Sequence, residues 1–176
     1  FYFKMIMFGG LVRAVGVRGG ARGCARRVGI GWQARRGVAT EYGTVRVTEE
    51  VLEEGKAAKV LKVCFARDEI HNAFNAAMIQ DILSVFRQID GICQDTERDI
   101  LDQPRCVVLS GDGKSFSAGA DLNWMKQMVE YTEEENAEDS RLLYDMVHAI
   151  RNCPIPVVAR VNGAALGGGA AGAPAP

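Results

Sequence analysis

From Thr44 onward the chain alternates short apolar runs with longer amphipathic stretches. Residues 44–51 (TVRVTEEV) and 59–66 (KVLKVCFA) have the length and composition of strands, and a turn containing Gly55 separates them. A helix with Asn75 as its N-cap is predicted next, because apolar residues then recur at three- and four-residue spacing. The candidates for its buried face are Ile79, Ile82, Leu83, Phe86 and Ile89.

The same alternation continues to the end of the sequence. Residues 105–111 (RCVVLSG) and 157–162 (VVARVN) predict two further strands, each too short for a buried helix. Asp121 is expected to cap a short helix, and a longer helix is expected over about residues 132–152. The apolar stripe of that longer helix consists of Leu142, Leu143, Met146, Val147 and Ile150. Strands and helices in this order predict a layered α/β fold.

The first 40 residues differ from the rest in charge. Of the 21 basic and 22 acidic residues, eight basic ones and no acid precede residue 41, so this segment carries +8 and the remainder −9. An arginine-rich, acid-free leader is typical of a mitochondrial presequence, and we expect residues 1–40 to be disordered and removed. The alternative is a basic arm that binds nucleic acid. The targeting leader is favoured because Trp32 is the one aromatic residue between Arg13 and Arg36, fewer than a stacking surface requires.

Cysteine and histidine indicate no metal site. The five cysteines are an odd number, are widely spaced and form no C-x-x-C pair, which favours a reducing compartment over a disulfide framework. His71 and His148 have no partner at metal-ligand spacing, so structural roles are expected for both. No run of 18 apolar residues occurs, and a membrane-spanning helix is therefore not expected.

Familiar glycine motifs fit this sequence poorly. The run GDGKS is not a phosphate-binding loop, because Val108 stands where that motif needs its first glycine. The run GKSFSAG matches a serine-nucleophile turn only loosely. Residues 167–172 satisfy G-x-G-x-x-G after a strand, but the acid that a dinucleotide site needs about 20 residues later is absent.

The two glycine-rich loops make better sense together. Each follows a predicted buried strand, and each is expected to lead into a helix. Backbone N–H groups at such turns lack internal partners, and glycine or alanine lets a ligand approach the backbone closely. Two such loops that converge form an oxyanion hole, which stabilises negative charge on a carbonyl or thioester oxygen. Tight turns without a function are the alternative for either loop alone.

The residues of these loops resemble a known family. The stretch KSFSAGADLNWMKQM, followed about 30 residues later by PIPVVARVNGAALGGG, is similar to the enoyl-CoA hydratase/isomerase (crotonase) superfamily. Upstream, VLKVCFARDEIHNAFNAAMIQDI resembles the opening strand and first helix of that family, with Asp68 in place of its usual proline. The resemblance implies a spiral of repeated ββα units. The stretches GADLNWM and EENAEDSRLL look most like the branch that hydrates methylglutaconyl-CoA-type substrates in leucine breakdown.

The resemblance also implies site residues and partners. It places the two oxyanion N–H groups on Ala120 and Gly168. The residues expected to bind substrate are Ala118, Gly119, Ala120, Asp121, Leu122 and Gly168. The substrate would be an α,β-unsaturated acyl-CoA thioester, to which water is added in the mitochondrial matrix. Coenzyme A is part of that substrate, so no separate cofactor is implied, and a complete homologue would form a trimer or hexamer.

The sequence departs from the family where acid–base groups are expected. Ala171 stands where the family has its first catalytic glutamate, and the second would fall beyond Pro176. We therefore interpret residues 41–169 as the N-terminal part of an acyl-CoA-binding domain, truncated before the second half of the core and the C-terminal helices. Residues 170–176 are interpreted as a low-complexity tail. On this interpretation the stripe of the long helix would lack its neighbouring layer, and the chain would be inactive.

Two other functions remain open at this stage. The chain could be a non-catalytic fragment that binds acyl-CoA or joins complete subunits, or a nucleic-acid-binding protein that uses its basic arm. Within the superfamily, isomerase and hydrolase chemistry use the same oxyanion hole, so the loops alone do not distinguish these reactions from hydration.

Overall fold

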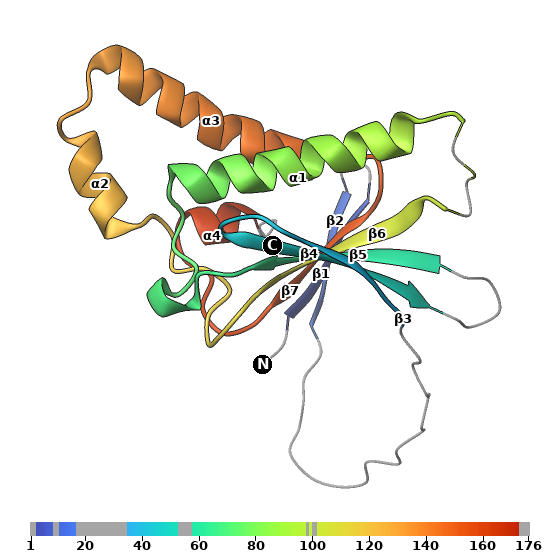
Figure 1. Ribbon diagram of the computed structural model, residues 1–176. Helices are drawn as coiled ribbons and strands as arrows, with labels where there is room; N and C mark the ends of the chain where they lie inside the picture. The colour runs from blue at the N-terminus through green and yellow to red at the C-terminus, as the bar shows by residue number, and fades with distance from the viewer. Residues whose placement is uncertain are drawn as a thin grey trace, which may run out of the picture.

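The computed structural model describes residues 3–8, 11–16, 35–52, 58–97, 99 and 102–172. Their strands form one sheet in the order β2-β1-β7-β6-β5-β4-β3 (Figure 1). The strands are β1 (Phe3–Phe8), β2 (Leu11–Gly16), β3 (Arg35–Glu41), β4 (Val45–Leu52), β5 (Ala58–Phe65), β6 (Pro104–Gly111) and β7 (Val157–Val161). The helices are η1 (Asp68–Ile70), α1 (Ala76–Gln94), α2 (Leu122–Met128), α3 (Glu133–Arg151) and α4 (Gly168–Gly172).

The centre of the sheet is parallel and its flanks are antiparallel. β5 pairs in parallel with β6, and β6 with β7. β4 runs antiparallel to β5, so β4, β5 and α1 make one ββα unit. Because parallel strands end at the same edge of a sheet, the loops after β6 and β7 emerge side by side.

The first long helix, α1, forms where the sequence predicted it. The side chain of Asn75 accepts a hydrogen bond from the Met78 N–H at 3.0 Å, which confirms the N-cap. Seven residues of α1 are buried, and they include all five of the predicted face. Burial of one large apolar side chain contributes about 1.5–3 kcal/mol. This helix therefore supplies much of the core.

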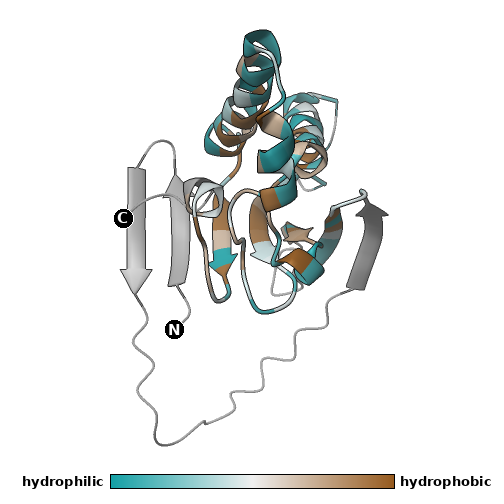
Figure 2. Ribbon diagram, turned by 90° about the vertical axis from the view of Figure 1, so that its left-hand side faces the viewer, coloured by the Kyte–Doolittle hydropathy of each residue, from teal (hydrophilic) through white to brown (hydrophobic). Residues whose placement is uncertain are grey.

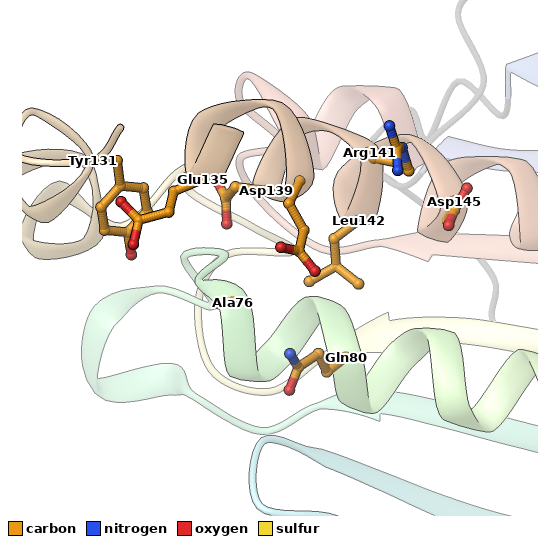
Figure 3. A pocket seen from close by; sticks show the side chains of 9 residues that line it. Ala76, Gln80, Tyr131, Glu135, Asp139, Arg141, Leu142 and Asp145 are labelled. Atoms are coloured by element: carbon orange, nitrogen blue, oxygen red, sulfur yellow. The ribbon is translucent and has the colours of Figure 1, made fainter. Parts of the chain in front are cut away.

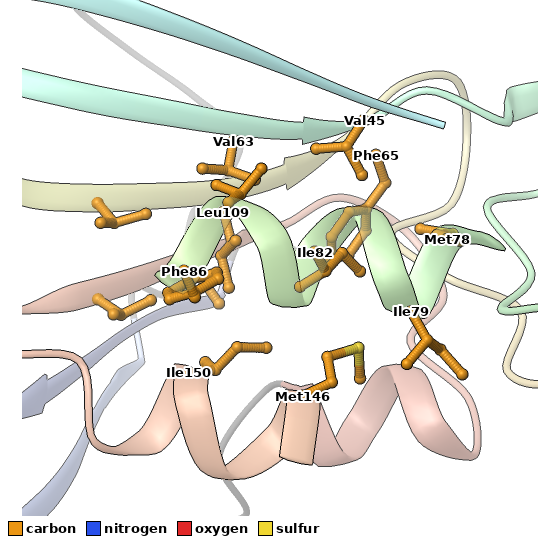
Figure 4. Close-up of a cluster of buried hydrophobic side chains, with 14 of the residues drawn as sticks. Val45, Val63, Phe65, Met78, Ile79, Ile82, Phe86, Leu109, Met146 and Ile150 are labelled. Atoms are coloured by element: carbon orange, nitrogen blue, oxygen red, sulfur yellow. The ribbon is translucent and has the colours of Figure 1, made fainter. Parts of the chain in front are cut away.

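The core lies on both sides of α1. Val63, Phe65 and Leu109 contact it from the sheet, while Met146 and Ile150 of α3 approach its opposite side (Figure 4). The layers therefore follow one another in the order sheet, α1, α3. Figure 2 shows the long helices α1 and α3 on one side of the strands. Met146 is 0% exposed and Ile150 is 4% exposed. The expectation that the α3 stripe lacks a neighbouring layer is therefore wrong, because α1 is that layer.

The predicted N-cap of α2 is present, and α3 begins with a capping box that was not predicted. Asp121 accepts the Asn123 N–H at 2.9 Å, as expected for the N-cap of α2. Thr132 and Glu135 form a reciprocal capping box at the start of α3. Three acids in the first turn of α3 are stabilised by the positive end of the helix dipole.

The basic leader shows strands where we expected no order. β1, β2 and the start of β3 lie within residues 1–40, and β1 pairs antiparallel with β7. Four of its arginines (Arg18, Arg22, Arg26 and Arg27) and Cys24 lie outside the described residues. Removal of the leader is not tested by these strands and stays a prediction.

The remaining expectations on the fold are met in part. The mixed α/β class is confirmed. α4 extends through Gly172 into the predicted tail, while residues 173–176 and the predicted turn at Gly55 lie outside the described residues. Among the helices described, none combines the length and the apolar character needed to cross a membrane.

Candidate oxyanion site

A buried asparagine holds the loop between β6 and α2, residues 112–121. The Oδ1 atom of Asn72 accepts the Arg67 N–H at 2.9 Å, and its Nδ2 donates to the carbonyl oxygens of Asp112 and Ser115, both at 2.9 Å. Asn72 is 0% exposed and has a φ of 54°, a left-handed conformation that asparagine adopts more readily than most residues. One side chain therefore ties this loop to the segment that precedes α1.

Backbone contact holds the loop between β7 and α4, residues 162–167. Gly163 has a φ of 66°, and a Cβ at this position would overlap the carbonyl oxygen of Lys114. Only glycine permits this approach without displacing one of the two backbones. At the start of the loop, the side chain of Asn162 donates to the Gly113 carbonyl at 3.0 Å.

The two loops lie against each other. The N–H groups of Phe116 and Ser117 both donate to the Ala164 carbonyl, at 3.0 and 3.2 Å. The Leu166 N–H donates back to the Ser117 carbonyl at 2.9 Å, and Ser117 pairs with Ala165 as an isolated parallel bridge. A single site that uses both loops requires this arrangement.

Ala120 has an unpaired N–H group in the first loop. It pairs with Phe74 as an isolated bridge, in which the Phe74 N–H donates to the Gly119 carbonyl at 2.7 Å and the Asp121 N–H donates to the Phe74 carbonyl at 2.8 Å. The N–H of Ala120 itself has no acceptor among the residues that the structure describes. It is therefore available to a ligand.

Gly168 has the matching group in the second loop. Its N–H likewise finds no acceptor in the described part of the chain, whereas the next N–H, of Gly169, donates to the Leu166 carbonyl at 2.8 Å. The ring of Phe74 adjoins this position, since a Cβ on Gly168 would lie 3.5 Å from its Cδ2 atom. Ala120 and Gly168 thus both adjoin Phe74.

The other predicted binding residues play different parts. The Ala118 N–H donates to the His71 carbonyl at 2.9 Å, and the Gly119 N–H donates to Ser117 Oγ at 3.2 Å, so neither N–H is free for a ligand. Leu122 is 72% exposed at the start of α2. Asp121 uses its carboxylate within the protein. The roles assigned to all these residues remain predictions.

Sequence reasoning missed an ion pair beside this site. Arg67 lies 3.2 Å from the carboxylate of Asp121, and both side chains are largely buried. The two residues are 54 positions apart, and neither belongs to a motif that predicts pairing. An arginine directly after a predicted strand and an aspartate after a glycine loop were the only signals in the sequence.

A thiol adjoins the start of the first loop. Cys64 at the end of β5 donates to the Asp112 carboxylate at 3.1 Å. Burial, and secondarily the neighbouring Asp112, raise the pKa of this thiol above its ordinary value, against an opposing hydrogen bond from Ser110. Burial likewise raises the pKa of Cys93, Cys106 and Cys153. A thiol whose pKa is raised is a poor nucleophile near neutral pH.

A cavity lies away from both loops, between α1 and α3 (Figure 3). It measures about 440 Å³, and none of its lining residues belongs to either glycine loop. Its walls carry the carboxylates of Glu135, Glu138, Asp139 and Asp145, with Arg141 among them. Burial raises the pKa of Asp139. Among the described residues, no three or more His, Cys, Asp or Glu side chains are grouped so that they could hold a metal ion.

Comparisons with known proteins agree with the family that the two glycine-rich loops resemble. Residues 55–173 match the family described as enoyl-CoA hydratase/isomerase. The enoyl-CoA isomerase/hydratase fer4 of Mycosarcoma maydis is 34% identical over 104 residues, which are 58% of this chain and 36% of that protein. The mitochondrial Δ(3,5)-Δ(2,4)-dienoyl-CoA isomerase of Mus musculus is 32% identical over 120 residues, covering 62% of this chain and 33% of the mouse protein.

A solved structure shows the same fold. The crystal structure of an enoyl-CoA hydratase from Shewanella pealeana superposes with a TM-score of 0.55 at 30% identity, covering 69% of this chain and 41% of that one. The chain thus spans well under half the length of the relatives it matches. Because the family match extends over most of its residues, the chain belongs to the enoyl-CoA hydratase/isomerase family.

Proposed function

We propose that the N–H groups of Ala120 and Gly168 together receive the thioester oxygen of an acyl-CoA. The observation that carries this proposal is that neither group has an acceptor among the described residues, on loops that pack against each other beside Phe74. Two aligned donors stabilise the negative charge that develops on that oxygen when the thioester becomes enolate-like. Removal of one such donor in an enzyme typically lowers the rate by ~10²–10³.

Hydration also needs groups that transfer protons. No acid follows Asp145 in the sequence, and Ala171 stands where the family resemblance places a glutamate. We therefore propose that the residues present bind and polarise the thioester, while addition of water requires carboxylates that these loops do not supply. Binding of acyl-CoA without turnover is the outcome that this proposal predicts for residues 1–176.

The finer proposals concern substrate, location and assembly. The substrate would be an α,β-unsaturated acyl-CoA, of the methylglutaconyl type if the similarity of GADLNWM to that branch extends to specificity. The acid-free leader and the mitochondrial mouse relative support a location in the mitochondrial matrix. A trimer or hexamer is proposed for a complete homologue from family resemblance alone.

Restoring the family's acid at residue 171 tests the proposed chemistry. Residues 1–176 should bind crotonyl- and methylglutaconyl-CoA by calorimetry but hydrate them negligibly. An Ala171→Glu variant should gain hydration on the order of 10²-fold, the lower end of what one acid–base group contributes. Loss of crotonyl-CoA absorbance measures the rate.

Ala170→Glu is the matched control, because it adds the same charge one position earlier in α4 and should not gain activity. Absence of acyl-CoA binding by the unmodified chain would refute the proposed function. Rapid hydration by the unmodified chain would refute the assignment of the missing proton-transfer groups.

A further inference from the structure

The orientation of the Ala120 N–H depends on its two neighbours. Gly119 and Asp121 each make a backbone hydrogen bond to Phe74, at 2.7 and 2.8 Å, so the peptide between them is fixed from both sides. A displacement of the segment that contains Phe74 would therefore change the direction in which the Ala120 N–H points.

The side chain of Arg67 spans this pair of segments. One guanidinium nitrogen donates to the Ala73 carbonyl at 2.8 Å, and another lies 3.2 Å from Oδ2 of Asp121. Ala73 directly precedes Phe74, and Asp121 directly follows Ala120. The arginine therefore joins the same two segments as the Phe74 bridge, through the residue before Phe74 and the residue after Ala120.

Both ends of this contact are rigid. The backbone of Arg67 is held by Asn72, whose Oδ1 accepts the Arg67 N–H at 2.9 Å and whose own N–H donates to the Arg67 carbonyl at 2.8 Å. The other carboxylate oxygen of Asp121 caps α2 through the Asn123 N–H. The side chains of Arg67 and Asp121 are 16% and 13% exposed, so water screens their attraction less than at the surface.

We propose that Arg67 is a positioning residue, which aims the Ala120 N–H at the thioester oxygen by joining Ala73 to Asp121. This inference rests on the proposed function, since it concerns the same oxygen. Lysine cannot replace the arginine, because a single ammonium lacks the planar fork that serves a carbonyl and a carboxylate together. Arg67 contacts no reacting atom and acts only through the loop.

Amide NMR of the full chain with butyryl-CoA tests this role. Butyryl-CoA is a saturated thioester and cannot be hydrated, so it reports binding alone. In the unmodified chain it should shift the resonances of both Ala120 and Gly168. In Arg67→Met the shift at Ala120 should fall to less than half, while that at Gly168 persists.

Further variants separate positioning from general stability. Asp121→Asn keeps a residue that caps helices well but loses the charge, so it should weaken the Ala120 response in the same direction. Arg67→Lys should respond like Arg67→Met. Arg46→Met is the matched control, because it removes an arginine–aspartate pair at 3.1 Å whose side chains are 44% and 38% exposed.

The outcomes are distinct. Full responses at both amides in Arg67→Met would overturn the inference, and so would equal loss at both, which would indicate a purely structural role. If Arg67→Met does not fold, Asp121→Asn decides by the same criterion. Absence of any response in the unmodified chain would refute the proposed function, and this inference with it.

Discussion

The loop that carries Ala120 and the loop that carries Gly168 present the same chemical group but are fixed differently. A buried side chain holds the first, because Asn72 donates to two of its carbonyl oxygens and accepts a third hydrogen bond from the Arg67 N–H. The second is held mainly by a close approach of backbone to backbone, which Gly163 permits. A polar side chain can be replaced by one that makes fewer or weaker hydrogen bonds, whereas the backbone contact at Gly163 leaves no room for an added Cβ atom. The two loops should therefore respond to mutation in different ways.

The largest effect is expected at Gly163. Alanine there would have to adopt a left-handed conformation, which costs about 1–2 kcal/mol, and its Cβ would also overlap the Lys114 carbonyl. Gly163→Ala should therefore destabilise the fold by about 3 kcal/mol or more, in the range of backbone-strain mutations. Urea denaturation followed by circular dichroism measures this loss.

Gly91→Ala provides the matched control with the opposite sign. Gly91 is exposed within α1, and a Cβ there meets nothing within 4 Å. Alanine favours a helix interior over glycine by about 1 kcal/mol, so this variant should be more stable than the original. A Gly163→Ala protein as stable as the unmodified one would contradict the claim that the second loop is anchored by a close backbone contact.

A smaller loss is expected at Asn72. Asn72→Ala leaves the Arg67 N–H and two loop carbonyls without this partner, at a cost of about 2–3 kcal/mol. Asn72→Gly removes the same hydrogen bonds but relieves the strain of the left-handed conformation, so the difference between the two variants reports that strain less the greater backbone entropy of glycine in the unfolded chain. Thermal and urea unfolding measure both.

Asn162→Ala is the counterpart in the second loop. Its side chain is only partly buried, and the Gly163 contact remains, so a loss of about 1 kcal/mol or less is expected. Equal losses at Asn72 and Asn162 would show that side chains anchor both loops alike.

The smallest effect concerns pH and only the first loop. The pKa of Cys64 is raised in the folded protein, chiefly by burial, so the folded state retains the proton where the unfolded thiol loses it. Stability should therefore fall as the pH rises above 9, the ordinary pKa of the thiol. Cys64→Ala should make this fall shallower at pH values above 9.

Denaturation midpoints at several pH values give the slope. Cys106→Ala is a useful comparison, because burial alone raises the pKa of that thiol and no carboxylate contact is involved. An unchanged slope in Cys64→Ala would contradict the contribution of this thiol to the pH dependence of stability.

The elements were predictable where their signals are local. The caps at Asn75, Asp121 and Thr132 lie within three residues of the groups they bond, so the sequence itself contains both partners. The short apolar runs of β5 and β6 likewise indicate buried strands. Glycine and alanine in two strand-to-helix turns indicated the unpaired N–H groups of Ala120 and Gly168.

Contacts between distant segments were not predictable in the same way. An apolar stripe on α3 shows that something covers it, but not that α1 does so. The pairing of Arg67 with Asp121 depends on how residues 67–74 lie against residues 119–121, which only the folded chain determines. Residues Phe74 and Asn72 were missed for that reason, since neither has a distinctive local pattern.

The position of Phe74 between Ala120 and Gly168 also bears on synthesis at the ribosome. Gly168 follows Phe74 by 94 residues. At ~5–20 residues per second, roughly 5–20 seconds pass before the last of the three segments is made. β7, which joins the sheet beside β6, is likewise made late. In the earlier part of that interval, after α1 (Ala76–Gln94) and before α3 (Glu133–Arg151), the face of α1 that α3 later covers has no partner, so the nascent chain exposes apolar surface of the kind that chaperones bind.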